Sequence, residues 1–172
     1  MRFDRIATKE ATKIRKIRLY LETTVFNYYF DDDRDGHEDV LKLFEAIKAG
    51  EFEAYTSDIV TRELRKAQEP KRSKMLALPK EYSINFLYDS PEVRILGGLY
   101  IVRGIIPASH LFDSMHVAIA SINRLDFVIS YNFHHINRNK TRLMTSLVNK
   151  EKGYGEVRIA TAKEALNNGK TV

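Results

Sequence analysis

The chain has 172 residues, of which 44% are hydrophobic and 30% charged, and this balance excludes general disorder and a fibrous repeat. Its length suits one domain with a core of its own. It contains no cysteine, which excludes disulfide bonds and thiolate metal sites, and its formal net charge is +5.

The positive charge is concentrated at the start of the chain. Residues 1–18 contain seven Lys and Arg against two Asp and Glu, whereas the rest of the chain contains 21 of each. We therefore divide the sequence into a basic N-terminal arm, residues 1–16, and one domain, residues 17–168. The arm could steer the protein toward phosphate groups or could serve only solubility. Further basic residues in 62–74 and 138–142 are expected to lie on solvated helix faces.

No stretch of the sequence has the pattern of a membrane span. The most apolar one, residues 95–112, contains Arg103, Pro107 and several glycines. The first residues lack the apolar core of a signal sequence, so we expect a cytoplasmic protein.

The first half of the chain alternates strand and helix patterns. Residues 17–22 read as a strand, and apolar residues then recur at helical spacing between a possible cap at Asp35 and Gly50. The acidic run 31–35 is predicted to be a turn or surface loop. Residues 52–56 form a second strand pattern, followed through Ser57 or Asp58 as a cap by a helix that Pro70 interrupts or ends.

The second half repeats this alternation. Residues 84–88 read as a strand, and the next helix has Ser90 as its N-cap, Pro91 at its first position and Gly104 at its end. A helix over 113–123 precedes the apolar run 127–130, which predicts an interior strand. Residues 157–160 predict a fifth strand, and the capping box in 161–164 starts a last short helix.

This alternation predicts an α/β fold of three layers, with a mainly parallel central sheet of about five strands covered by helices on both faces. Ligands of such sheets bind beyond the carboxyl ends of the strands. Glu22 ends the first strand and Asn132 follows the fourth, while Glu63 and Asp113 lie in helices that leave the same edge. We expect these four oxygen-bearing side chains to converge.

Each acid also has a simpler explanation. Glu63 shares an inward helix stripe with Ile59 and Val60, where a salt bridge to an arginine would satisfy it. Asp113 could cap its helix, and Glu22 could be an ordinary loop acid. Convergence favours a shared site, because burying an unpaired charge costs several kcal/mol or more, roughly, and a cation would offset that cost.

An oxygen-only ligand set suits Mg²⁺ or Mn²⁺ better than zinc. Such an ion can lower the pKa of a water, orient a phosphodiester and stabilise the leaving oxygen, which makes nucleic acid hydrolysis the expected chemistry. The sequence has no phosphate-binding loop, dinucleotide fingerprint or serine-hydrolase elbow, so a nucleotide-dependent enzyme or serine hydrolase is not expected.

Other residues near this edge have two interpretations each. His134 and His135 could touch phosphate or substrate, or could be surface and supporting residues. His116, on the apolar face of its helix, is expected to be a satisfied core residue. The aromatic residues in 28–30 could stack on bases or belong to the core.

Four segments together resemble the motifs of the PIN-domain ribonucleases, a family that includes VapC-type toxins. They are 19–27, 57–64, 113–120 and 130–136, in the order of that family's motifs. The sequence is similar to the subgroup with Glu in the first motif and Asn in the fourth.

The resemblance implies roles for individual residues. Glu22, Glu63 and Asp113 would hold Mg²⁺ or Mn²⁺, Asn132 would complete the catalytic site, and Thr23 would orient Glu22. Asn27, Ser130 and His135 are the remaining candidates for supporting or substrate-contacting residues. A metal-activated water would then cleave RNA.

The resemblance also implies a biological role and partners. The protein would be the toxin component of a type II toxin–antitoxin system, a homodimer silenced by an antitoxin segment laid over the acidic cleft. Two alternatives stay open. Glu22 replaces a more usual Asp, and Asn132 stands where many relatives have an acid, so the protein could be a catalytically weak or inactive PIN module that binds RNA or protein. It could also be a phosphatase or nuclease of another α/β class.

Overall fold

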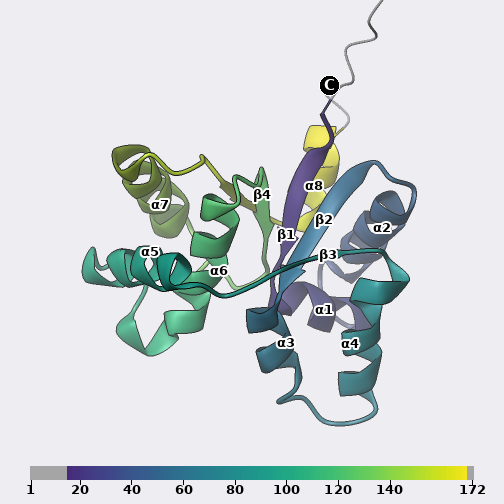
Figure 1. The fold of residues 1–172 in the computed structure, drawn as a ribbon. Helices are drawn as coiled ribbons and strands as arrows, with labels where there is room; N and C mark the ends of the chain where they lie inside the picture. The colour runs from purple at the N-terminus through teal and green to yellow at the C-terminus, as the bar shows by residue number, and fades with distance from the viewer. Residues whose placement is uncertain (1–14, 170–172) are drawn as a thin grey trace, which may run out of the picture.

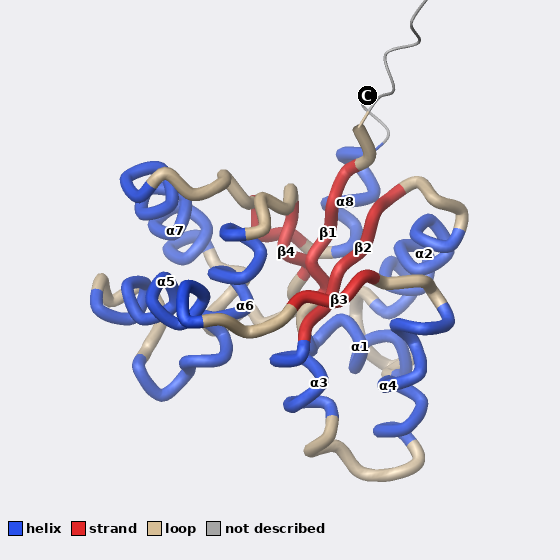
Figure 2. The backbone as a smooth tube through the Cα atoms, in the orientation of Figure 1, coloured by secondary structure: helices blue, strands red, loops and turns tan. Residues whose placement is uncertain are grey.

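The computed structural model describes residues 15–169, so the predicted basic arm lies outside the described residues except for Arg15 and Lys16. In these residues the strands form one parallel sheet in the order β3-β2-β1-β4-β5 (Figure 2). The strands are β1 Ile17–Leu21, β2 Phe52–Ser57, β3 Asn85–Leu87, β4 Phe127–Ile129 and β5 Arg158–Ala160. The predicted five-stranded sheet is confirmed, and each strand lies within about a residue of its expected position.

The strand pairing aligns the carboxyl ends of the interior strands at one edge. Leu19 of β1 pairs with Ala54 of β2 on one side and with Phe127 of β4 on the other. All of β4 is buried, so its predicted interior position is confirmed, and β1 is the middle strand. Segments that leave β1, β2 and β4 therefore begin close together.

Helices cover both faces of the sheet, as predicted. In Figure 1, α5, α6 and α7 lie on one side of the sheet, and α1, α2 and α8 on the other. The helices are α1 Thr23–Phe30, α2 His37–Lys48, α3 Asp58–Leu64, α4 Lys71–Glu81, α5 Pro91–Val102, α6 Leu111–Ile122, α7 Asn139–Lys152 and α8 Ala162–Gly169, with a 3-10 turn, η1, at Ala108–His110.

Capping residues explain the helices that begin where the sequence predicts. Ser57 accepts a hydrogen bond from the backbone N–H of Val60, and Ser90 accepts one from Val93. The capping box of α8 is also formed: the Thr161 N–H donates to Glu164 Oε2 at 2.7 Å, and the Glu164 N–H donates to Thr161 Oγ1 at 3.3 Å.

Three helix boundaries differ from the prediction. Asp35 does not cap α2, because the cap position is Gly36 in the left-handed region at φ 106°. The helix after β2 ends at Leu64, well before Pro70, and α6 begins at Leu111 rather than at Asp113.

Three helices were not predicted, and each lacks a clear apolar stripe in its sequence. The β-branched start of α1 resembles a strand, but Glu22 caps it and Val25 and Phe26 are buried. In α4 only Met75 and Leu78 are buried. The buried positions of α7 are mostly polar: Thr141, Thr145 and Asn149 accompany Val148. Hydrophobic periodicity cannot detect a helix whose inner face is polar or short.

The basic clusters after residue 60 are partly ion-paired rather than only solvated. Arg62 contacts Asp58 and Asp89, Lys71 contacts Asp31, and Arg142 contacts Glu164. Between residues 15 and 169, no helix combines the length and apolar character that crossing a membrane requires.

Candidate active site

Glu22 is the first residue after β1 and is almost completely buried, with 2% of its surface exposed. It is the N-cap of α1, and its carboxylate accepts hydrogen bonds from the backbone N–H of Thr24, at 3.0 Å, and from the Thr24 hydroxyl. Burial raises the pKa of Glu22, although the charge of His116 and the Thr24 hydrogen bonds oppose that shift. Glu22 is therefore a buried capping acid rather than an ordinary loop acid.

Glu63 extends from α3 toward α6 and pairs with a histidine, not with an arginine. Its Oε2 lies 2.7 Å from Nε2 of His116 and also accepts the hydroxyl of Thr23. Burial would raise the pKa of Glu63, but the hydrogen bond and charge of His116 lower it overall. The predicted inward orientation of Glu63 is confirmed.

His116 is buried in α6 and has a partner on each ring nitrogen, as expected of a satisfied core residue. Its Nδ1 lies 2.8 Å from the hydroxyl of Tyr20, which lies 2.7 Å from that of Ser57. Burial would lower the pKa of His116, but the hydrogen bond and charge of Glu63, with the charges of Glu22 and Asp113, raise it. A doubly protonated ring can donate to Glu63 and to Tyr20, and Tyr20 can then donate to Ser57.

Asp113 lies one turn before His116 and does not cap its helix, because the N-cap position of α6 is His110. Its Oδ2 is 3.2 Å from Nδ1 of His110, within ion-pair distance. The geometry is not that of a hydrogen bond, because Oδ2 is a buried acceptor without a hydrogen-bond partner. Oδ2 of Asp113 thus lies buried beside His110 without a hydrogen-bond donor.

The other predicted residues have local partners. Oδ1 of Asn132 accepts the backbone N–H of His135 at 3.1 Å, and the hydroxyl of Ser130 accepts the N–H of Asn132 at 3.0 Å. The amide of Asn27 donates to the carbonyl of Thr23 within α1. Thr23, expected to orient Glu22, donates to Glu63 instead, and Thr24 takes the expected role. The catalytic roles of these residues stay predictions.

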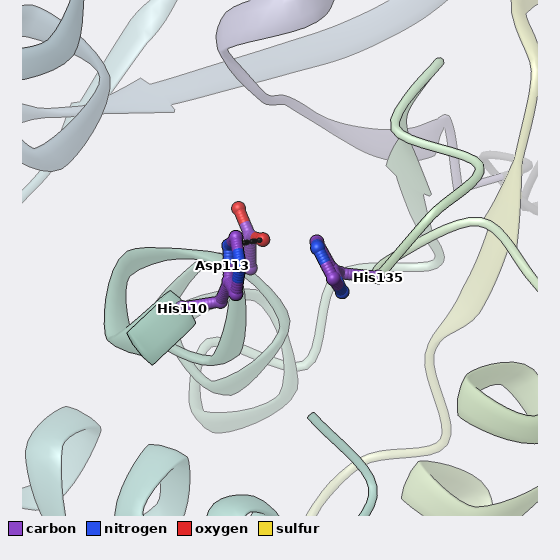
Figure 3. A group of neighbouring side chains, drawn as sticks. All are labelled: His110, Asp113 and His135. Carbon is purple, nitrogen blue, oxygen red and sulfur yellow. Dashed lines mark ion pairs between the residues drawn. The ribbon is translucent and has the colours of Figure 1, made fainter. Parts of the chain in front are cut away.

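A cluster that the sequence prediction missed lies beside Asp113. His110, Asp113 and His135 offer ligand atoms that all lie within 4.8 Å of one another (Figure 3). Within residues 15–169, no other group of three or more His, Asp or Glu side chains has ligand atoms this close together. Glu22 and Glu63 are not part of this group. His110 was not predicted; its spacing of three residues from Asp113, one helical turn, was the available signal.

The two histidines of this cluster face each other. Their ring centroids are 3.7 Å apart, and Nδ1 of His135 is buried without a hydrogen-bond partner. Burial and the charge of His110 lower the pKa of His135. His134, by contrast, is exposed, as one of its two interpretations predicted.

The three acids therefore share a neighbourhood without forming one compact ligand set. Glu22, Glu63 and Asp113 come from three separate segments, and Glu63 is hydrogen-bonded to His116, which lies one turn after Asp113 in α6. Such an edge, with anionic groups in a partly buried setting, is suited to binding a divalent cation.

Comparison with known proteins identifies the fold of this site. Residues 19–140 match the family model of the PIN domain. No curated protein matches the chain.

Solved structures with the same fold include three from bacteria. VapBC2 from Rickettsia felis, bound to a DNA fragment from its promoter, is 13% identical and covers 84% of this chain and 98% of its own. VapC20 from Mycobacterium tuberculosis, a toxin that cleaves the sarcin-ricin loop, is 12% identical, with 81% and 98% covered. VapBC-1 from nontypeable Haemophilus influenzae is 13% identical, with 86% and 99% covered. Each has a TM-score of 0.52.

Proposed function

The chain belongs to the PIN-domain family, and on that premise we propose that it is a metal-dependent endoribonuclease, the toxin of a type II toxin–antitoxin pair. The observation that carries the proposal is the placement of Glu22, Glu63 and Asp113 at the carboxyl edge of the parallel sheet, with Glu63 hydrogen-bonded to His116, one turn after Asp113 in α6. Parallel α/β sheets bind their ligands at this edge.

The donors at this edge fit a hard divalent ion. Oδ2 of Asp113 is buried without a hydrogen-bond partner. The hydrogen bonds from Thr23 and His116 to the Glu63 carboxylate are both accepted by Oε2, so neither of them occupies Oε1. Carboxylate oxygens are the ligands that Mg²⁺ and Mn²⁺ prefer. Glu63 and Asp113 would hold the ion, and Glu22 would join them if its carboxylate turned away from Thr24. When bound, such an ion supplies an activated water and stabilises the leaving oxygen of a phosphodiester.

Neighbouring residues keep Glu63 charged and in place. His116 donates to Glu63 and lowers its pKa, so the carboxylate is ionised at neutral pH. Thr23 fixes the same oxygen from α1. The positive charge of Lys66 also lowers the pKa of Glu63.

Similar proteins support RNA as substrate and a protein as inhibitor. VapC20 is a toxin that cleaves the sarcin-ricin loop, and two of the similar structures are VapBC proteins. By analogy, this protein would form a homodimer, would be inhibited by an antitoxin and would act in the cytoplasm, where its RNA substrates are found.

A module that binds RNA or protein without catalysis is the second candidate. The observation that favours it is Glu22, whose carboxylate caps α1 and whose pKa is raised by burial. Such a carboxylate is a poorer metal ligand, because an ion must first compete with a proton and with Thr24.

RNA cleavage separates the two candidates. Purified protein with Mn²⁺ is expected to cleave single-stranded or structured RNA, and a chelator should stop the reaction. Asp113→Asn should lower the rate about 100-fold or more, because it removes a charged ligand. Asp33→Asn, which changes an exposed acid in the loop before α2, should cleave at the wild-type rate. RNA binding without turnover in the wild type would support the second candidate.

A further inference from the structure

His110 and Asp113 lie within one turn of chain at the start of α6, and His135 lies in the loop after β4 (Figure 3). The ligand atoms of these three side chains are all within 4.8 Å of one another. We propose that His110, Asp113 and His135 form a mixed nitrogen and oxygen site that binds a first-row transition-metal ion in preference to Mg²⁺.

Two polar atoms in this cluster need a partner. Oδ2 of Asp113 and Nδ1 of His135 are the buried side-chain polar atoms without a hydrogen-bond partner in residues 15–169. Leaving such an atom unsatisfied costs about 1–3 kcal/mol. Both atoms belong to the same cluster, so one cation bound there could contact both.

The scaffold holds His135 in position from two sides. Its backbone N–H donates to Oδ1 of Asn132 at 3.1 Å, and its carbonyl accepts the hydroxyl of Thr141 at 2.6 Å. His110 is the N-cap residue of α6 and Asp113 lies in the first turn of that helix, so the start of α6 fixes them relative to each other. Binding therefore requires small side-chain movements rather than refolding of a loop, which lowers its entropic cost.

The donor chemistry determines which ions bind. Two imidazole nitrogens and one carboxylate oxygen suit Mn²⁺, Co²⁺, Ni²⁺ and Zn²⁺. The affinity of such sites rises from Mn²⁺ through Co²⁺ and Ni²⁺ to Cu²⁺ and falls again at Zn²⁺. Mg²⁺ prefers oxygen ligands and keeps much of its water shell. Three protein ligands also leave coordination positions open to water or a substrate oxygen.

One nearby charge opposes binding. The positive charge of Arg138 acts on His135. The Arg138 guanidinium, however, donates to the carbonyl of Ile105 at 2.8 Å and to the hydroxyl of Thr141 at 3.2 Å, which holds it in fixed contacts. The negative charge of Asp113 lies in direct contact with His110 and offsets it.

This site shares Asp113 with the proposed nuclease site but does not rest on nuclease activity, because binding can be measured without RNA. Glu63 is not one of its ligands. Glu63→Gln should therefore impair RNA cleavage while leaving ion binding at the histidine cluster unchanged.

The test is a Co²⁺ titration of the full-length protein, prepared without a polyhistidine tag and followed by visible absorption. The wild type should bind Co²⁺ even in excess Mg²⁺. His110→Ala and His135→Ala should each weaken binding about 100-fold or more. His134→Ala is the matched control: it removes an exposed histidine next to His135 and should bind like the wild type.

A second readout needs no variant. In the wild type with two equivalents of Mn²⁺, enough to fill both proposed sites, pulsed electron paramagnetic resonance should detect nitrogen nuclei coupled to the ion. Absence of that coupling, or equal Co²⁺ affinity in the wild type, His110→Ala and His135→Ala, would overturn the proposal. If the histidine site fails these tests but the protein still cleaves RNA, the nuclease proposal stands. If Co²⁺ binds through the histidines but the protein cleaves no RNA, only the nuclease proposal fails.

Discussion

Glu63→Gln is expected to lower the rate of RNA cleavage about 100-fold or more while preserving the fold. The amide oxygen of glutamine can still accept the hydroxyl of Thr23 and the Nε2–H of His116, so the local geometry is retained. What is lost is the negative charge that would hold a divalent ion at the edge of the sheet. Initial rates on a labelled RNA, with Mn²⁺ at saturating concentration, measure the effect.

A control variant tests whether the loss of activity comes from position 63 or from any Glu-to-Gln change. Glu51→Gln makes the same substitution at an exposed residue between α2 and β2 and should cleave at the wild-type rate. If Glu63→Gln also retains full activity and its circular dichroism spectrum is unchanged, Glu63 does not hold a catalytic ion.

His116→Ala is expected to lower the free energy of unfolding by about 3–5 kcal/mol. The variant leaves the partly buried Glu63 carboxylate without its hydrogen-bonded cation, and it also removes one of the two partners of the buried Tyr20 hydroxyl. It creates a cavity in the packed face of α6 as well. Urea denaturation of the metal-free protein, followed by circular dichroism, gives the difference.

The pH dependence of this loss follows from the two shifted pKa values. Because the pKa of His116 is raised on folding, its contribution is complete below the ordinary value of 6.5 and is lost as the pH rises through the folded value. Because the pKa of Glu63 is lowered, its contribution is complete above 4.5 and is lost as the pH falls through its folded value. The loss in His116→Ala should therefore be largest between pH 4.5 and 6.5.

The matched control for stability is His134→Ala, an exposed histidine whose removal should change the unfolding free energy by less than about 0.5 kcal/mol. A loss of under about 1 kcal/mol in His116→Ala at pH 6 would show that the Glu63–His116 pair does not stabilise the fold.

The sheet could be predicted from the sequence because its strands are short apolar runs separated by capped helices. Ser57, Ser90 and the capping box in 161–164 mark helix starts through hydrogen bonds between neighbouring residues, which the sequence alone specifies. The start of α1 could not be found this way, because its cap is a glutamate whose burial depends on the packing of β1 and β4. Nor could α7, whose buried face is mainly Thr141, Thr145 and Asn149.

The candidate site was predictable in its location but not in its pairings. Alternation of strands and helices places Glu22, Glu63 and Asp113 at one edge of a parallel sheet. The partner of Glu63 depends on how α3 packs against α6, which sequence spacing does not specify. The contact of His110 with His135 depends likewise on the path of the loop after β4. The cluster of His110, Asp113 and His135 was therefore not predicted from the sequence.

The location of a bound ion tests the central claim most directly. In crystals soaked with Mn²⁺, anomalous scattering should give a peak within coordination distance, about 2–2.5 Å, of carboxylate oxygens of both Glu63 and Asp113. A further peak between His110 and His135 is compatible with this result. If the Mn²⁺ sites are fully occupied and no peak lies within coordination distance of Glu63, the account is contradicted.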